Sequence, residues 1–242
     1  MEISTGRRPA GRHPSPGPAP AYLGPALAGD PTRPLLTYYD DASGERTELS
    51  AVTLGNWVVK TANLLLDGCG LGEGDRAAVL LPPHWQTAAV LLGAWTAGLS
   101  VARDGGAPAG PVEVVFAASD RLAGAPEAEH RFVLGLAPMG APLPEVPAGW
   151  QDYAREVLAH SDRLPPYAGA GAPGWQAQAR QAAADAGLRP GDRVLVDAAA
   201  HPDPVRWLLA PLLAGASVVL CAHLDPAAVA SRAATERVTR VL

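Results

Sequence analysis

Lysine is almost missing from this chain, because eighteen of its nineteen basic residues are arginine and Lys60 is the only lysine. Together with abundant alanine, this imbalance indicates a GC-rich bacterial genome. Basic residues are also outnumbered by acidic ones, and the formal net charge is −5. Since nucleic-acid binding depends on a basic surface that neutralises phosphates, we expect no nucleic-acid partner.

Cysteine and long apolar runs are scarce as well. Cys69 and Cys221 lie far apart, and neither belongs to a CxxC pair or to a cluster with zinc spacing, so we interpret both as packing residues and predict no metal site. The apolar stretch Ala88–Val101 is shorter than the ~20 residues of a bilayer span. No apolar run follows the basic N-terminus, as a secretory signal would require. We therefore expect a cytoplasmic protein without a membrane partner.

Proline and glycine are present in quantity, and they gather in two segments. Residues 1–30 contain GRRPAGRHPSPGPAP, which cannot bury enough apolar surface to offset the entropy of ordering, so we predict a disordered tail. Residues 141–173 are interpreted as a Pro/Gly-rich connection with one helix, Trp150–Ala159. The rest divides into a first α/β half, 31–140, and a second α/β half, 174–242.

Strands and helices are expected to alternate along these halves. A polar turn at 41–44 separates two runs that can pair as a hairpin, and Ser50 or Thr53 can cap the helix that follows. Helical spacing at 54–65 and 85–97 alternates with strand-like runs at 76–82, 112–117 and 131–135. This pattern predicts an α/β fold with a mainly parallel sheet covered on both faces.

An internal repeat is the most informative feature. Residues 70–101, GLGEGDRAAVLLPPHWQTAAVLLGAWTAGLSV, align without a gap with residues 187–218, GLRPGDRVLVDAAAHPDPVRWLLAPLLAGASV, at an offset of 117. The two segments share 13 of 32 positions. Each unit reads as a Gly-Asp-Arg turn, a strand, a helix, an Ala-Gly turn and a second strand. The sequence therefore predicts two pseudo-repeated βαβ-type halves.

The succession LLTYYDDASGERTELSAVTL followed by the first repeat resembles the amino-terminal part of the adenylate-forming enzymes, the AMP-dependent acyl-CoA synthetases and ligases. GLRPGDRVLV and LLAPLLAGASVVL are similar to the stretch beyond their phosphate loop. The resemblance covers about residues 34–242 and is closest to short actinobacterial-type proteins that look like the first part of such a ligase. It implies two similar α/β subdomains, here in a truncated form.

The same resemblance implies a Ser/Thr/Gly-rich loop, YTSGTTGxPKG, that holds ATP phosphates. The corresponding segment here is YAGAGAPGW, in which Ala168, Ala170 and Ala172 stand where hydroxyl-bearing residues are expected and no lysine follows. Its glycines are better interpreted as a flexible connection. The family's magnesium-binding glutamate, ribose-binding aspartate and catalytic lysine would all lie beyond Leu242. Lys60 cannot replace that lysine, because its helix precedes the first repeat.

Some polar residues could belong to a site, although each has a structural alternative. His84 and His201 share a repeat position between a strand and a helix, where open α/β sheets bind ligands and where capping residues are also common. The pairs Asp75–Arg76 and Asp192–Arg193 could be acid and cation pairs, but their repetition favours a shared turn.

Asp40 and Asp41 could touch a metal, although acidic residues are common in solvated turns. The other histidines singled out, His130, His160 and His223, have no partner at ligand spacing. We nominate no catalytic, cofactor-binding or metal-binding residue.

The preserved scaffold and the missing chemistry predict a catalytically inactive homologue of the AMP-dependent ligases. It would bind a partner protein or a small acyl or adenylate metabolite, would need no cofactor, and could form a homodimer through an exposed sheet edge. The alternative is an acyl-adenylate-forming ligase, or a half-enzyme completed by a second protein, which would use ATP or AMP and magnesium. A remnant without a role is a third interpretation.

Overall fold

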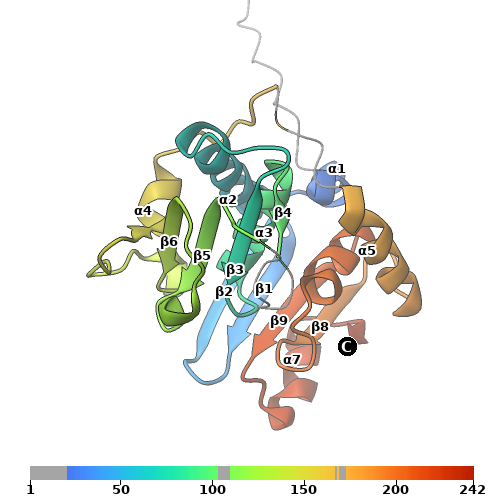
Figure 1. Ribbon diagram of the computed structural model, residues 1–242. Coiled ribbons are helices and arrows are strands. Elements are labelled where there is room, and N and C mark those ends of the chain that lie inside the picture. Colours follow the sequence, from blue (N-terminus) through green and yellow to red (C-terminus); the bar gives the residue numbers. More distant parts are fainter. Residues whose placement is uncertain (1–20, 103–109, 167, 169–172) are drawn as a thin grey trace, which may run out of the picture.

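Two mainly parallel sheets organise the protein, as the computed structural model shows for residues 21–102, 110–166, 168 and 173–242 (Figure 1). Sheet A has the strand order β10-β8-β9-β1-β2 and sheet B the order β4-β3-β5-β6-β7. Only the β1–β2 hairpin pairs antiparallel among the described strands, so the predicted α/β class is confirmed. The strands of sheet A are β1 (Pro34–Asp40), β2 (Glu45–Ser50), β8 (Arg193–Asp197), β9 (Ser217–Ala222) and β10 (Arg240–Val241). Those of sheet B are β3 (Arg76–Leu80), β4 (Ser100–Val101), β5 (Val114–Ala118), β6 (His130–Leu134) and β7 (Gln151–Asp152).

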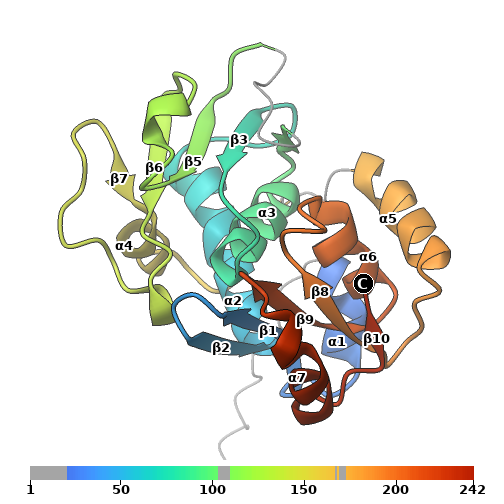
Figure 2. The ribbon, with the colours of Figure 1, turned by 90° about the horizontal axis from the view of Figure 1, so that it is seen from below.

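Helices α2 (Ala51–Asn63) and α3 (Trp85–Thr96) lie between the two sheets (Figure 2). Ser50 caps α2, because its side chain accepts a hydrogen bond from the Thr53 N–H at 3.1 Å. α2 continues as a π-helical turn, Leu64–Gly68, and all 12 residues of α3 are buried. A helix that is apolar on every side is typical of a central layer. The two helices therefore join both sheets to one core.

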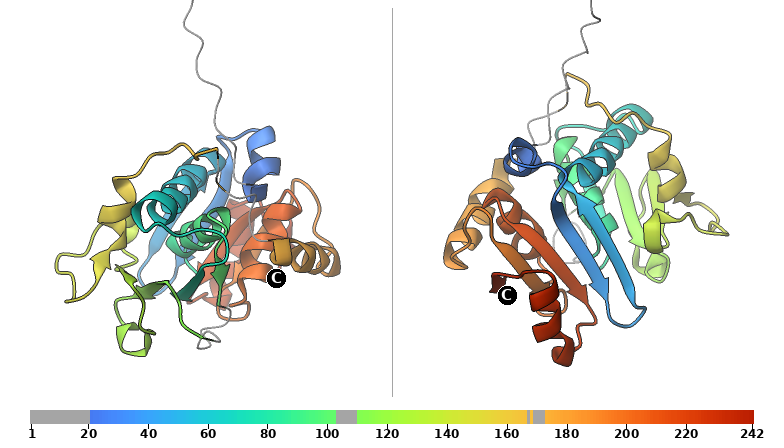
Figure 3. Two further views of the ribbon diagram at one scale, coloured as in Figure 1. Left: turned by 45° about the horizontal axis from the view of Figure 1, so that its top comes forward. Right: turned by 180° about the vertical axis from the view of Figure 1, so that it is seen from behind.

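The remaining helices flank the sheets (Figure 3). They are α1 (Gly24–Ala28), α4 (Tyr153–Leu158), α5 (Pro173–Asp185), α6 (Ala210–Leu213) and α7 (Val229–Thr235). A π-helical turn, Val205–Leu209, leads directly into α6. On the face of sheet A away from the main core, Leu195, Val219 and Cys221 form a small separate cluster. No helix in the described ranges is long and apolar enough to cross a membrane.

The two repeat units have the same local geometry 117 residues apart. Arg76 pairs with Ser100 between β3 and β4, and Arg193 pairs with Ser217 between β8 and β9. The N–H groups of both serines donate to the carbonyl of the aspartate before the first strand, at 2.9 Å in each unit. The repeated sequence thus folds into two units that share strand register as well as element order.

Four helices end in one motif. The second residue after the helix has a positive φ, and the N–H of the following residue donates to the carbonyl five residues before it. Glycine occupies the positive-φ position after α3, α5 and α6, at Gly98, Gly187 and Gly215. After α7 the position belongs to Arg237, with φ +54°. The Val238 N–H bonds to the Ala233 carbonyl at 2.9 Å, as in the other three motifs. Arg237 therefore adopts a conformation that usually favours glycine.

The hairpin of β1 and β2 lies in the same sheet as the strands of the second repeat unit. β1 belongs to the predicted first half, 31–140, and pairs in parallel with β9 of the predicted second half, with Leu36 opposite Val218. The division of the chain into two halves remains a prediction.

The helix expected at Trp150–Ala159 is also shorter than predicted. The chain first forms β7, and α4 then begins at Tyr153, where the Asp152 carboxylate accepts from the Arg155 N–H at 2.8 Å.

Candidate functional site

Two cavities lie at opposite ends of the parallel strands. The first, which we call the apolar cavity, has a volume of about 530 Å³ and lies beyond the carboxyl ends of β3 and β8. The second, the charged cavity, has a volume of about 460 Å³ and lies at the amino ends of β8, β9 and β1. Ligands of open α/β sheets usually bind beyond the carboxyl ends of the strands, so the apolar cavity is the first candidate site.

The walls of the apolar cavity come from both repeat units. The first unit contributes Leu81, Pro82 and Leu91, and the second contributes Trp207 and two prolines. Trp175, in the first turn of α5, completes the wall and contacts the ring of Trp95 with centroids 5.0 Å apart. The cavity thus lies where the two units meet, beside the start of α5.

One charged side chain in this wall, that of Arg121, is available to a ligand. The indole N–H of buried Trp207 has no hydrogen-bond partner among the described residues. Arg121 is the only charged residue of the described wall, and its side chain makes no hydrogen bond or ion pair with the described chain. The arrangement can therefore hold an apolar body with an acceptor or an anionic head.

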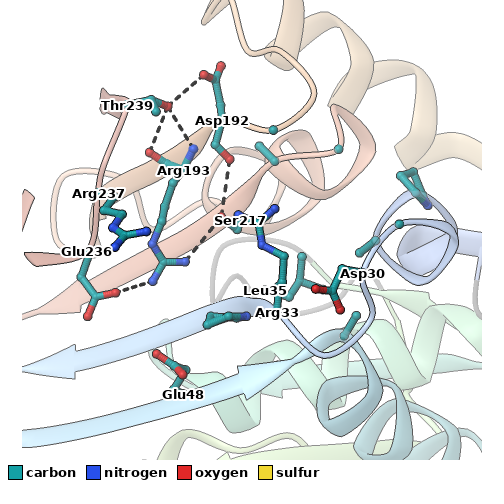
Figure 4. A pocket seen from close by; sticks show the side chains of 18 of the residues that line it. Asp30, Arg33, Leu35, Glu48, Asp192, Arg193, Ser217, Glu236, Arg237 and Thr239 are labelled. Atoms are coloured by element: carbon teal, nitrogen blue, oxygen red, sulfur yellow. Dashed lines mark hydrogen bonds and ion pairs between the residues drawn. The ribbon is translucent and has the colours of Figure 1, made fainter.

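The charged cavity is built around Arg193 and Glu236 (Figure 4). Their ion pair is nearly removed from solvent, with 13% of the Arg193 side chain and 5% of the Glu236 side chain exposed. Glu236 also accepts from the Tyr39 hydroxyl at 2.5 Å and from the Arg46 Nη2 at 2.9 Å. Burial alone would raise the pKa of Glu236, but the hydrogen bonds from Tyr39, Arg193 and Arg46 lower it to about 2. Glu236 is therefore a permanent anion at neutral pH.

The two histidines of the repeat differ in their roles. His84 is the N-cap of α3, where its Nδ1 accepts from the Gln86 N–H at 3.1 Å. Only 3% of its side chain is exposed, and its Nε2 lies 3.9 Å from a carboxylate oxygen of Glu45. In the second unit, Asp203 accepts from the Val205 N–H at 2.9 Å and performs the corresponding capping. His201 is half-buried in the turn before it.

The repeated Asp-Arg pairs stabilise turns, as predicted. Asp75 accepts from the Gly72 N–H and Asp192 from the Arg189 N–H, each at 2.8 Å. The side chain of Arg193 also makes contacts outside this turn, because it donates to the Thr37 hydroxyl at 2.9 Å and forms an ion pair with Glu236.

The acids of the hairpin turn have partners within the fold. Asp40 accepts from the Ala42 N–H at 2.9 Å and lies 2.7 Å from Nδ1 of His223. Asp41 binds both terminal nitrogens of Arg232, at 2.5 and 3.1 Å. That hydrogen bonding lowers the pKa of Asp41. Both carboxylates therefore tie the hairpin to the segment that carries α7.

The other residues singled out from the sequence do not converge. His130 begins β6, and the carbonyl of His160 accepts from the Lys60 ammonium group at 2.5 Å. Burial raises the pKa of Cys69 to about 11 and also raises that of Cys221. Within the described ranges, no three His, Cys, Asp or Glu side chains gather into a possible metal site. Of the segment that resembles a phosphate loop, Tyr167 and residues 169–172 lie outside the described residues.

The pair of α/β sheets is the architecture of the first half of adenylate-forming acyl-CoA synthetases. The crystal structure of an acyl-CoA synthetase from Brucella canis superposes with a TM-score of 0.70 and 20% identity, over 93% of this chain and 47% of that chain. The anthranilate CoA ligase AuaEII, solved in complex with anthranoyl-AMP, gives a TM-score of 0.63 and 15% identity, over 91% of this chain and 48% of that chain. The chain thus spans about half the length of these enzymes and shares the fold of that half.

A full-length likeness identifies the family. A TIGR03089 family protein from Mycobacterium tuberculosis is 46% identical over 238 residues, which are 92% of this chain and 96% of that relative. The chain therefore belongs to the TIGR03089 family. Comparison with models of known protein families gives no match.

Proposed function

We propose that this protein is a non-catalytic member of the adenylate-forming fold that binds a small apolar metabolite in the apolar cavity. The single observation that carries the proposal is that cavity, which lies where open α/β sheets bind ligands and falls within the size range of small-molecule sites. Leucine and tryptophan surfaces favour an aliphatic or aromatic body. Arg121 favours a carboxylate or another acceptor at one end of the ligand.

The absence of catalysis is supported by the phosphate-loop segment of the sequence. Alanines at 168, 170 and 172 replace the hydroxyl groups that would bind ATP phosphates, and no lysine follows them. The residues present therefore do not fit an ATP-binding loop. Loss of one preorganised donor typically costs about 3–4 kcal/mol of transition-state stabilisation, and several are missing here.

ATP–pyrophosphate exchange is the test for catalysis. We expect the purified full chain to give no exchange above background with a panel of aliphatic and aromatic carboxylic acids and magnesium. Saturable exchange, in proportion to the concentration of the chain, would overturn the non-catalytic part of the proposal.

Binding is tested by tryptophan fluorescence, because Trp175 and Trp207 line the cavity. We expect decanoate to change the tryptophan emission saturably. Decanol should bind more weakly, because it has no negative charge to pair with Arg121. Trp207→Phe should weaken decanoate binding, because the smaller ring removes part of the apolar wall. Trp95→Phe is a matched control, because Trp95 is also buried with an unpartnered indole N–H but does not line the cavity.

The controls separate ligand binding from a general loss of structure. Both variants should keep a cooperative thermal transition. Equal loss of binding in the two variants, or no saturable signal in the native chain, would contradict the proposed site.

An alternative function is a half-enzyme that forms acyl adenylates with ATP and magnesium when a second protein completes it. The observation that favours it is that the chain spans about half of two solved ligase structures. Co-expression with proteins encoded beside it, followed by the exchange assay, tests this possibility. Exchange activity that requires both chains would replace the first proposal. Absence of exchange activity in every co-expressed pair would contradict the alternative.

A further inference from the structure

The charged cavity has a distribution of charge that the proposed function does not use. Its wall contains four carboxylates, and each has a partner within the fold. Asp30 accepts from the Thr32 hydroxyl at 2.7 Å, and Glu48 pairs with Arg46 at 2.7 Å. Asp192 pairs with Arg240 at 3.0 Å, and Glu236 binds Arg193 and Arg46. Three of the four carboxylates are therefore neutralised by an arginine, whereas the hydrogen-bond partner of Asp30 is an uncharged hydroxyl.

Two further arginines of the same wall have no hydrogen-bonded partner. The side chains of Arg33 and Arg237 make no hydrogen bond or ion pair with the described residues. Figure 4 shows Arg33 extending from the start of β1 towards Ser217, and Arg237 beside Glu236 on the other side of the cavity. The charge of Arg33 helps to lower the pKa of Asp30, but neither guanidinium group is hydrogen-bonded within the described chain. Two sets of free guanidinium donors thus reach the cavity from separate elements of the fold.

The backbone at Arg237 is a second observation that points to a role for this side chain. The other three helices that end in the same motif have glycine at the positive-φ position, whereas α7 has arginine there. A residue with a side chain adopts this conformation at a free-energy cost. Stability alone therefore favours glycine at position 237, while the arginine places a guanidinium group at the cavity.

We propose that the charged cavity binds a small anion with at least two negative charges. A guanidinium group matches the geometry of carboxylate and phosphate oxygens, and two such groups at one cavity favour a ligand with two anionic centres. The Ser217 hydroxyl, which donates to the Asp192 carbonyl at 3.5 Å, lies in the same wall. The volume of about 460 Å³ admits a phosphate ester or a polycarboxylate. This site lies at the opposite end of the strands from the apolar cavity, and its test is independent of the proposed function.

Isothermal titration calorimetry of the full chain at low ionic strength tests the site with two probes, pyrophosphate and citrate. Saturable binding of either probe, weakened by added salt, is the expected result. Binding of pyrophosphate alone would assign the site to phosphate esters, and binding of citrate alone would assign it to polycarboxylates. Absence of saturable binding for both probes would overturn the proposal.

Three variants locate the binding and separate it from folding. Arg33→Gln and Arg237→Gly should each lower the affinity at least about tenfold, because each removes one charge-assisted contact. Arg237→Gly should at the same time unfold at the same or a higher temperature, so its loss of binding cannot come from a damaged fold. Arg180→Gln is the matched control, since Arg180 is an exposed arginine of α5 outside the cavity, and it should bind like the native chain. Native affinity in Arg33→Gln and Arg237→Gly would place the anion elsewhere and refute the assignment.

Discussion

Replacement of Glu236 by glutamine should remove a pH-dependent part of the stability of this protein. The pKa of Glu236 is lowered from 4.5 to about 2 in the folded chain, where its side chain is only 5% exposed. Such a decrease corresponds to about 3 kcal/mol of unfolding free energy at neutral pH. The physical source is the set of hydrogen bonds from Tyr39, Arg193 and Arg46, which stabilise the ionised carboxylate.

The sign of the effect follows from the direction of the pKa change. Because the folded pKa lies below the unfolded value, the contribution is fully present above about pH 5 and is lost as the pH falls from 4.5 towards 2. Between pH 7 and pH 3, the contribution decreases by about 2 kcal/mol. The stability difference between the native chain and Glu236→Gln should therefore shrink by about that amount over this range.

Urea unfolding of the two chains at pH 7, 5 and 3 measures this difference directly. The comparison cancels the titration of other carboxylates that the two chains share. Glu127→Gln is the control, because Glu127 is 91% exposed and its pair with Arg131 is long, at 3.7 Å. It should change the stability by less than about 0.5 kcal/mol at every pH. A difference for Glu236→Gln that stays constant from pH 7 to pH 3 would refute the reasoning.

Two further predictions concern packing and thiol reactivity. A Cβ atom at Gly93 would lie 2.5 Å from Cβ of Thr61, so Gly93→Ala should destabilise the chain by about 1–3 kcal/mol in urea unfolding. Gly24→Ala is the control and should not destabilise it, because a Cβ atom at Gly24 would have no neighbouring atom within 4 Å. Native stability of Gly93→Ala would show that α2 and α3 are not in such close contact. The pKa of Cys69 is raised to about 11, chiefly by burial, so iodoacetamide at pH 8 should modify it about a hundredfold more slowly than free cysteine, as followed by mass spectrometry. Urea should restore the fast rate, and fast modification of the folded chain would contradict the burial of this thiol.

Local sequence chemistry was enough to predict the repeat units. The Gly-Asp-Arg turns and the glycines after the helices determine backbone conformation within a few residues, so an alignment could anticipate the shared geometry. The pairing of β1 with β9 was not predictable in the same way. Leu36 pairs with Val218, although most of the sequence separates the two residues. A parallel partner strand so distant in sequence leaves no periodic pattern near either strand.

The candidate sites were less accessible to sequence reasoning than the fold. Arg33 and Arg237 come from opposite ends of the chain and look like ordinary surface arginines in the sequence. The positive φ of Arg237 is visible only in the backbone, and Trp207 has the apolar spacing of a core residue. Only the capping role of His84 and the turn role of the Asp-Arg pairs had local signals strong enough to predict.

The position of β1 between β2 and β9 has a consequence for how the protein is made. Residues 34–40 leave the ribosome well before residues 217–222, by on the order of 10–30 s at ordinary rates of synthesis. During that interval the nascent chain carries a completed hairpin whose inner edge has no neighbour. Sheet A therefore closes only after residues 217–222 have been synthesised, and the emerging polypeptide has to be protected from aggregation until then.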